Sequence, residues 1–103
     1  MTDKVRIGLA QLNPTVGDIV GNVDLVRRAR ADAAAAGADL VVTSELAVSG
    51  YPPEDLVIRP IVQQTVEREV RALAAETGDG GPAVLIGAPW VEDGWLYNAS
   101  LLL

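Results

Sequence analysis

The sequence predicts an α/β fold with the element order β-α-β-α-β-β. Half of the 103 residues are hydrophobic and only 4% are aromatic, so the core must rest on Val, Leu, Ile and Ala. That composition suits parallel strands covered by helices. Two short apolar runs, 39–43 and 83–88, have the form of strands that are buried on both faces. A chain of this length can build at most one hydrophobic core, which means one domain or part of one.

The first half of the chain predicts a β-α-β unit. Residues 4–12 alternate apolar and other side chains and lead into an Asn-Pro turn, which predicts a first strand. Asn22 is a good N-cap, and Gly37 is a natural residue just past a helix end, so we expect a helix over about 23–36. The apolar run 39–43 follows as the second strand.

The second half predicts a helix and a β-hairpin. Pro60 fits the first position of a helix that we expect to end at about residue 77, and the run 83–88 follows as the third strand. Asp93-Gly94 is a hairpin signal, so 95–103 should lie antiparallel to the third strand. Such a unit leaves one sheet face uncovered, and the sequence stops inside an apolar strand. We therefore expect further strands and helices in the natural protein.

The composition excludes several classes of function. With 8 basic and 14 acidic residues the net charge is -6, which disfavours nucleic acid and anionic lipid and favours a small-molecule or protein partner. The chain has no Cys and no His, so thiolate or imidazole metal sites, Cys nucleophiles and Ser-His triads are excluded within it. We expect no metal or cofactor in this chain. No signal-peptide or membrane-spanning run is present, so the expected location is cytoplasmic.

Glu45 is the strongest candidate for chemistry. It follows the second predicted strand, and in open α/β sheets functional groups gather past the carboxyl ends of strands. Its apolar neighbours would bury it in part and disfavour its charged form, which suits a general base. The alternative is a structural carboxylate that caps the next turn or faces water.

A second group of candidates lies in the loop that follows. Tyr51 stands between Gly50, which can adopt backbone angles that other residues avoid, and two prolines that stiffen the loop. Such a loop could place Tyr51 in the wall of a substrate pocket, and the alternative is a tyrosine packed on the surface. Glu54 and Asp55 are interpreted as solvated or helix-start charges.

Two stretches of the sequence resemble a known family. Residues 10–18 read AQLNPTVGD and are followed by Gly21-Asn22, and residues 45–56 read ELAVSGYPPEDL. Together they resemble the carbon-nitrogen hydrolase, or nitrilase, superfamily, and within it the glutaminase domain of glutamine-dependent NAD synthetases. The Glu followed by Gly-Tyr is shared across the superfamily, and the extension 50–56 is similar to the synthetase branch. The resemblance covers the whole chain, 1–103, as the amino-terminal portion of the family's domain.

The resemblance implies a fold and a mechanism. The family's fold is an α-β-β-α sandwich, usually paired with a second copy, so a homo-oligomer is expected. Its catalytic set is Glu, Lys and Cys: Glu45 would be the general base, and Lys would stabilise the oxyanion. Glutamine's amide would pass through a thioester and release ammonia. A carboxyl-terminal synthetase domain would use that ammonia with ATP and magnesium to amidate nicotinic acid adenine dinucleotide to NAD.

The sequence departs from the family pattern in its catalytic set. It contains no Cys, and its one Lys, Lys4, lies at the start of the first predicted strand, where the family's catalytic Lys does not sit. Both residues are expected beyond Leu103, and Ser44 stands where many relatives have Pro. We therefore expect no glutaminase activity from this chain alone. Two alternatives stay open: another nitrilase-like amidase or carbamoylase, and a non-catalytic α/β interaction module.

Overall fold

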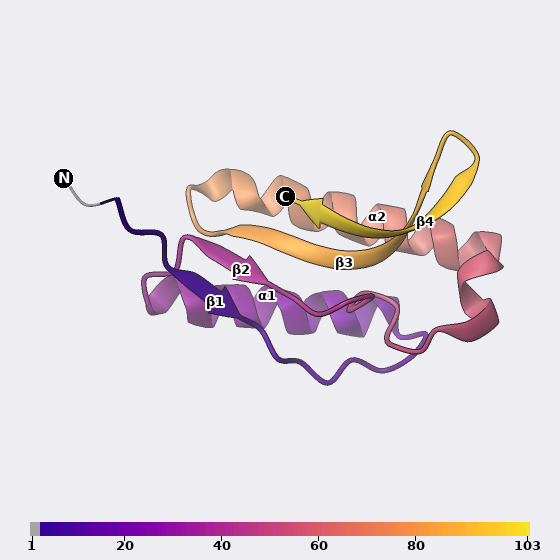
Figure 1. The fold of residues 1–103 in the computed structure, drawn as a ribbon, viewed down its shortest axis with the longest axis horizontal. Helices are drawn as coiled ribbons and strands as arrows, with labels where there is room; N and C mark the ends of the chain where they lie inside the picture. The colour runs from indigo at the N-terminus through magenta and orange to yellow at the C-terminus, as the bar shows by residue number, and fades with distance from the viewer. Residues whose placement is uncertain (1–2) are drawn as a thin grey trace.

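The computed structural model describes residues 3–103, and within them the strands form one four-stranded sheet (Figure 1). In sheet order the strands are β1 (Ile7–Leu9), β2 (Leu40–Val42), β3 (Ala83–Glu92) and β4 (Trp95–Leu102). The first three strands are parallel, and β4 runs antiparallel to β3. Each parallel connection contains a helix, so the predicted order β-α-β-α-β-β is confirmed.

Both long helices lie on one face of the sheet. Helix α1 (Ile19–Ala35) connects β1 to β2, and α2 (Pro60–Glu76) precedes β3. Figure 1 shows the two helices behind the strands, with the other face of the sheet toward the viewer. Two short 3-10 helices, η1 (Glu54–Ile58) and η2 (Thr77–Asp79), flank α2. Within residues 3–103 no helix is both long and apolar enough to cross a membrane.

The hydrophobic core lies between the sheet and the two helices. It is built almost entirely from aliphatic side chains, as the composition predicts: Ile19, Val23, Val26, Val48, Val66, Val70, Leu73, Val84, Ile86 and Ala88. The opposite face of the sheet is open to solvent: Ile7 is 55%, Leu9 74% and Leu102 70% exposed. The predicted uncovered sheet face is therefore present in the described chain, as expected for half of a two-sheet sandwich.

Helix α1 begins earlier than the sequence predicted. Asp18, and not Asn22, is the N-cap, and its carboxylate accepts a hydrogen bond from the N–H of Gly21 at 3.1 Å. Asn22 is 1% exposed and lies inside the first turn, where its amide binds other segments of the chain. Asp and Asn are equally good caps, so local preference could not choose between them. At the other end, Gly37 has φ +82° directly after the C-cap, as predicted.

The strand lengths follow from the available partners. β1 was expected over 4–12 but spans three residues. Within residues 3–103 it pairs with β2, which is also three residues long. β3 extends to Glu92, further than the predicted 88, because β4 pairs with it along its whole length. The hairpin turn is Asp93-Gly94, with φ values of 52° and 80°, which confirms the predicted two-residue turn.

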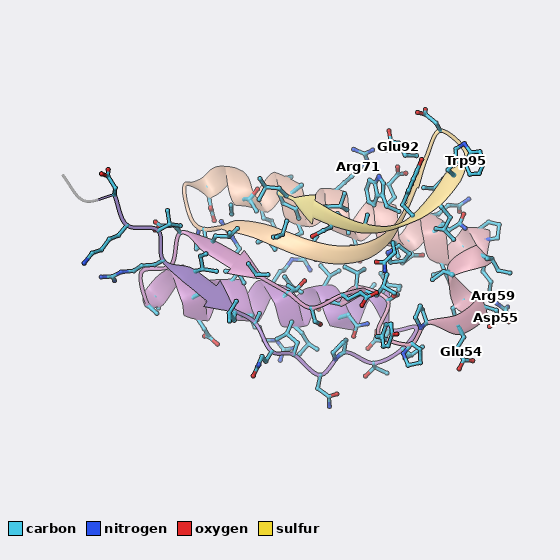
Figure 2. The ribbon with its side chains drawn as sticks, viewed as in Figure 1. Glu54, Asp55, Arg59, Arg71, Glu92 and Trp95 are labelled. Atoms are coloured by element: carbon cyan, nitrogen blue, oxygen red, sulfur yellow. The ribbon has the colours of Figure 1, made fainter. Side chains whose placement is uncertain are left out.

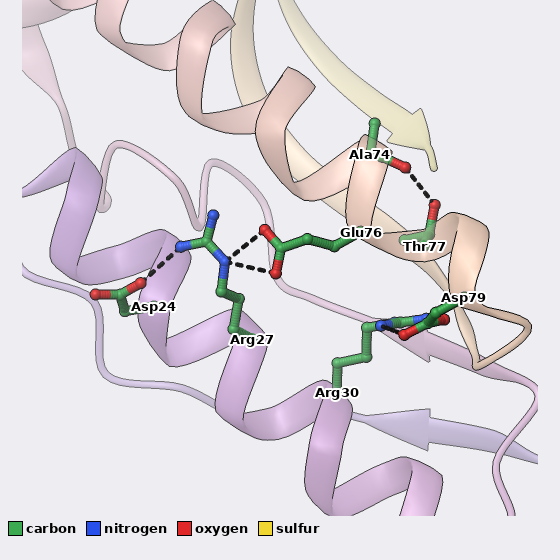
Figure 3. A network of polar contacts seen from close by, with 7 residues as sticks. All are labelled: Asp24, Arg27, Arg30, Ala74, Glu76, Thr77 and Asp79. Atoms are coloured by element: carbon green, nitrogen blue, oxygen red, sulfur yellow. Dashed lines mark hydrogen bonds and ion pairs between the residues drawn. The ribbon is translucent and has the colours of Figure 1, made fainter.

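Two arginines of α1 bind the end of α2 and the turn before β3 (Figure 3). Arg27 donates to Glu76 at 2.8 Å and to Asp24 at 2.6 Å, and hydrogen bonding to Glu76 is the main cause of its raised pKa. Arg30 donates to both oxygens of Asp79, at 2.7 and 3.1 Å, and its Nε donates to the carbonyl of Pro82 at 2.8 Å. These contacts fix the register of α1 against the segment that leads into β3.

The Arg30–Asp79 pair should make stability depend on pH in a narrow window. Hydrogen bonds from Arg30, then one from the N–H of Gly81, lower the pKa of Asp79 to about 2 from its ordinary 3.8. A lowered pKa means stabilisation that is complete above the unfolded value and is lost as pH falls through the folded one. We expect Asp79→Asn to reduce the thermal midpoint above pH 4, and the difference from wild type to shrink between pH 4 and 2.

Thermal unfolding monitored by circular dichroism across that pH range checks this. Asp32→Asn is the matched control, because Asp32 is an exposed carboxylate of α1 with no ion pair in the described structure. A difference between wild type and Asp79→Asn that stays constant down to pH 2 would contradict the assignment.

Candidate active site

Glu45 lies where the sequence placed it, just past the carboxyl end of β2. Val42 is the last residue of the strand, and Thr43 and Ser44 separate it from Glu45. The expectation of partial burial is wrong, because Glu45 is exposed in the described chain. Leu46 has φ +51°, a left-handed backbone conformation that is uncommon outside glycine, and it turns the chain into the core. Leu46 and the residues up to Gly50 are buried. The apolar neighbours that follow Glu45 therefore pack into the core, while its carboxylate is exposed to solvent.

The backbone on both sides of Glu45 is hydrogen-bonded to β3. The N–H of Thr43 donates to the carbonyl of Leu85 at 3.0 Å. The N–H of Gly87 donates to the hydroxyl of Thr43 at 3.1 Å, and the N–H of Val48 donates to the carbonyl of Gly87 at 3.1 Å. The loop therefore continues the pairing that β2 makes with β3, and Glu45 stands on a fixed backbone.

Gly87 allows this close approach. A Cβ at this position would lie 2.7 Å from the nitrogen of Leu46 and 3.2 Å from the carbonyl carbon of Glu45, with the carbonyl oxygen of Ser44 also in conflict. These are backbone atoms that cannot move aside as a flexible side chain can. A glycine inside a strand is a signal of such close contact. Gly87 was not predicted to support the site, although a glycine inside the apolar run 83–88 carries that signal.

A second support joins the two sequence stretches that carry the family resemblance. The side chain of Asn22 accepts from the N–H of Thr15 at 2.8 Å and donates to the carbonyls of Thr15, at 2.8 Å, and Val48, at 2.9 Å. All three bonds go to backbone groups of two loops, so one buried amide fastens the loop after β1 to the loop after β2. Buried polar groups that are satisfied in this way are costly to remove.

Gly50 completes the contact between these loops. Its φ of +80° confirms the unusual backbone predicted for it, and an added Cβ would lie 2.7 Å from the Cα of Val16. Close by, the N–H of Gly17 donates to the carbonyl of Ser49 at 2.9 Å. The Glu45 loop is therefore packed against β3 on one side and against the loop after β1 on the other.

Asn98 of β4 contacts the candidate carboxylate directly. Its Nδ2 donates to Oε1 of Glu45 at 2.7 Å, although the two residues lie 53 positions apart in the sequence. No role was predicted for Asn98 from the sequence. Its presence in a strand, where Asn is disfavoured, is the one signal that could have drawn attention to it.

A shallow apolar cavity of about 210 Å³ lies beside this pair. It is lined by residues of the loop, η1 and the β3–β4 hairpin: Leu46, Pro53, Val57, Pro89, Leu96, Tyr97 and Asn98. Tyr51 is not among them and is 65% exposed, so the described chain does not bring its ring to this cavity. A role for Tyr51 in substrate binding stays a prediction.

The remaining acidic candidates, Glu54 and Asp55, make no hydrogen bond to Glu45 in the described chain. Figure 2 shows Glu54 and Asp55 on η1, at the end of the molecule near Arg59. Both are exposed and occupy the first turn of η1, which agrees with their interpretation as helix-start charges. Within residues 3–103 no group of three or more metal-ligating side chains comes together.

The family comparison agrees with this arrangement. A model of the carbon-nitrogen hydrolase family matches residues 6–103. The chain belongs to this family. The matched range includes Glu45, its supports in β3 and the loop after β1, and Asn98, so every residue that builds the site falls inside it.

Relatives of this chain include glutamine-dependent NAD(+) synthetases. A glutamine-dependent NAD(+) synthetase of Rhodobacter capsulatus is 46% identical over 103 residues, which is all of this chain and 18% of that protein. A glutamine-dependent NAD(+) synthetase structure from Cytophaga hutchinsonii has a TM-score of 0.85 at 31% identity, covering 96% of this chain and 17% of its own. The chain thus spans less than a fifth of the length of these synthetases.

A smaller hydrolase also shares the fold. A variant of an amidase from Nesterenkonia sp. AN1, in whose structure acrylamide has added to the active-site cysteine, has a TM-score of 0.71 at 27% identity. The match covers 86% of this chain and 35% of the amidase. The sheet and helices described here are therefore common to synthetases and simple amidases of the family.

Gly87→Ala should displace the Glu45 backbone. Because the added methyl group meets backbone atoms, we expect a loss of about 1–3 kcal/mol in the free energy of unfolding. The shift of the carboxylate should lower the rate of any reaction of the full-length protein that depends on Glu45 by about 100-fold. Denaturant unfolding and steady-state kinetics measure the two effects.

Gly78→Ala is the control, because a Cβ there meets nothing within 4 Å. Wild-type activity in Gly87→Ala would refute the argument that Gly87 is needed for the close approach of the Glu45 loop to β3.

Asn22→Ala should destabilise the protein through its loops. It leaves backbone groups of Thr15 and Val48 without partners, so we expect a cost of about 2–3 kcal/mol in the free energy of unfolding. Asn13→Ala is the matched control, since Asn13 is exposed and its side chain makes no hydrogen bond in the described structure. Equal denaturation midpoints for the two variants would show that Asn22 does not fasten the loops.

Proposed function

We propose that this chain is the amino-terminal part of a glutamine-hydrolysing domain of a glutamine-dependent NAD synthetase, with Glu45 as its general base. The observation that carries the proposal is the 46% identity over all 103 residues to a protein of that name, in a chain that places Glu45 at the carboxyl end of β2. The Gly-Tyr-Pro-Pro-Glu-Asp-Leu loop after Glu45, residues 50–56, also favours the synthetase branch.

The geometry supports a base that works on groups brought from outside this chain. Glu45 is exposed, and the hydrogen bond from Asn98 engages one carboxylate oxygen, Oε1. The carboxylate is therefore open to a partner on the uncovered side of the sheet. In the proposed reaction Glu45 takes the proton of a Cys thiol, and the sulfur attacks the side-chain amide carbon of glutamine.

The proposed reaction then proceeds in two balanced halves. The tetrahedral intermediate, its oxyanion stabilised by a Lys, collapses with cleavage of the C–N bond, and the leaving nitrogen receives the proton from Glu45 to depart as ammonia. Glu45 next takes a proton from water, and the oxygen attacks the thioester. Cleavage of the C–S bond releases glutamate, and the proton returns from Glu45 to the thiolate.

Several parts of this machinery are not in the chain. It has no Cys, and Lys4, its one Lys, is exposed at the start of the chain before β1. We place the catalytic Lys and Cys, and a synthetase domain that uses ATP and magnesium to amidate nicotinic acid adenine dinucleotide, elsewhere in the full-length protein. A homo-oligomer and a cytoplasmic location belong to the same proposal.

A second candidate is a nitrilase-like amidase or carbamoylase. The structural match to the Nesterenkonia amidase, over 86% of this chain, favours this candidate. That enzyme has the same sheet and helices and is named an amidase, not a synthetase. Assaying the full-length protein for NAD formation from glutamine separates the two. Amide hydrolysis without any NAD formation would favour the amidase.

Glu45→Gln in the full-length protein tests the assigned base. It keeps the size of the side chain but cannot accept the thiol proton, so we expect glutamine-dependent NAD formation to fall by about 100- to 10,000-fold. Formation from added ammonia should persist, because it bypasses amide cleavage. Steady-state rates with each nitrogen source measure both.

Glu54→Gln is the matched control, since Glu54 is an exposed acid of η1 outside the site. We expect its rates to stay close to wild type with both nitrogen sources. Normal glutamine-dependent activity in Glu45→Gln would refute the assignment of Glu45 as the base.

A further inference from the structure

Glu45 and Asn98 are brought together by the two edges of one strand. β3 pairs with β4 along one edge, with Asn98 opposite Pro89, and holds the Glu45 loop along its other edge through Gly87. The loop that carries Glu45 and the strand that carries Asn98 are both hydrogen-bonded to β3, so the distance between the two side chains is set by the spacing of the sheet. The 2.7 Å contact between Nδ2 of Asn98 and Oε1 of Glu45 therefore follows from how β3 pairs along its two edges.

The chemistry of the contact suits a carboxylate that must be held in one orientation. A donor at 2.7 Å to a carboxylate oxygen is a short, charge-assisted hydrogen bond. It restricts rotation of the carboxylate, and Oε2 has no hydrogen-bond partner in the described structure. An amide does this without adding charge, whereas Lys or Arg at this position would pair with the carboxylate and compete with the proton.

The surroundings of Asn98 show that its side chain is not needed for the core. Asn98 is exposed, and on the alternating pattern of β4 it shares its face with Leu102, which is 70% exposed on the side of the sheet away from the helices. In the described structure the side-chain amide of Asn98 has one hydrogen bond, the one to Glu45. A purely structural role would call for a second anchor.

We propose that Asn98 is a positioning residue that orients the carboxylate of Glu45 for proton transfer. The inference rests on the proposed function, because it assigns Asn98 to the same amide-cleaving site. Asn98 acts through Glu45 and does not take part in bond making or breaking. Its contribution should appear in the chemical step and not in the binding of glutamine.

The test uses the full-length protein with three substitutions at one position. Asn98→Asp keeps the shape but replaces the donor with an acceptor, Asn98→Ala removes the group, and Asn98→Gln keeps an amide donor. We expect kcat for glutamine-dependent NAD formation to fall by about 10- to 100-fold in Asn98→Asp and Asn98→Ala, while KM for glutamine changes by less than about threefold. Asn98→Gln should recover part of the lost kcat.

Two readouts separate this role from general damage to the fold. Formation of NAD from added ammonia should be unchanged in all three variants, and Ser100→Ala, an exposed residue on the same face of β4, should match wild type with both nitrogen sources. If Asn98→Ala does not fold, the isosteric Asn98→Asp decides the question.

The outcomes that overturn the inference are distinct from those that overturn the proposed function. Wild-type kcat in Asn98→Asp, alongside an inactive Glu45→Gln, would remove the role of Asn98 and leave Glu45 as the base. A raised KM with unchanged kcat would make Asn98 a binding residue and would also overturn the positioning role. Full glutamine-dependent activity in Glu45→Gln would overturn both proposals together.

Discussion

The pairing of β3 along both of its edges is the constraint on which the candidate site depends. Val84 and Leu103 exchange two backbone hydrogen bonds, so Val84 and every second residue after it in β3 direct their backbone N–H and C=O groups toward β4. Of the residues between them, Leu85 and Gly87 form hydrogen bonds with the loop that carries Glu45. By the same alternation the nitrogen of Pro89 lies on the edge of β3 away from β4. This nitrogen carries no hydrogen, so proline at this position removes no hydrogen bond between β3 and β4. One strand therefore fixes both the carboxylate and its hydrogen-bond partner.

The rest of the structure keeps this arrangement in place. The two arginines of α1 bind the segment that leads into β3, through Glu76 and Asp79, and so set the helix against the strand. Asn22, from the first turn of the same helix, holds the loop after β2 from the opposite side. The core packs beneath the Glu45 loop through Val48, which is fully buried. Polar contacts at the surface and apolar contacts below thus converge on one short loop.

The exposed face of the sheet gives this loop its chemical setting. Glu45 and Asn98 both face solvent, and Ile7, Leu9 and Leu102 expose apolar surface on the side away from the helices. A sheet with one apolar face bare is half of a layered fold, in agreement with a chain that spans 18% of its synthetase relative. On the proposed function, the groups that Glu45 serves reach it from that open side.

Most of the secondary structure could be predicted from the sequence, and the exceptions have physical causes. The helix that begins at Pro60 uses a residue whose φ is fixed, and the Asp93-Gly94 turn uses positive φ angles that Gly adopts readily. Both were predicted correctly. The start of α1 was misplaced because Asp18 and Asn22 are equal in local capping preference. The tertiary structure separates them, since Asn22 is the one with buried backbone partners.

The sequence by itself determined that Glu45 follows a strand of a parallel sheet, because hydrophobic periodicity is a local property that can be seen along the chain. Only the tertiary structure decided that Glu45 is exposed, that Gly87 gives its backbone room, and that Asn98 binds its carboxylate. These relations join residues that are distant in the sequence. They arise from the pairing of strands and the close passage of two backbones, which no local pattern encodes.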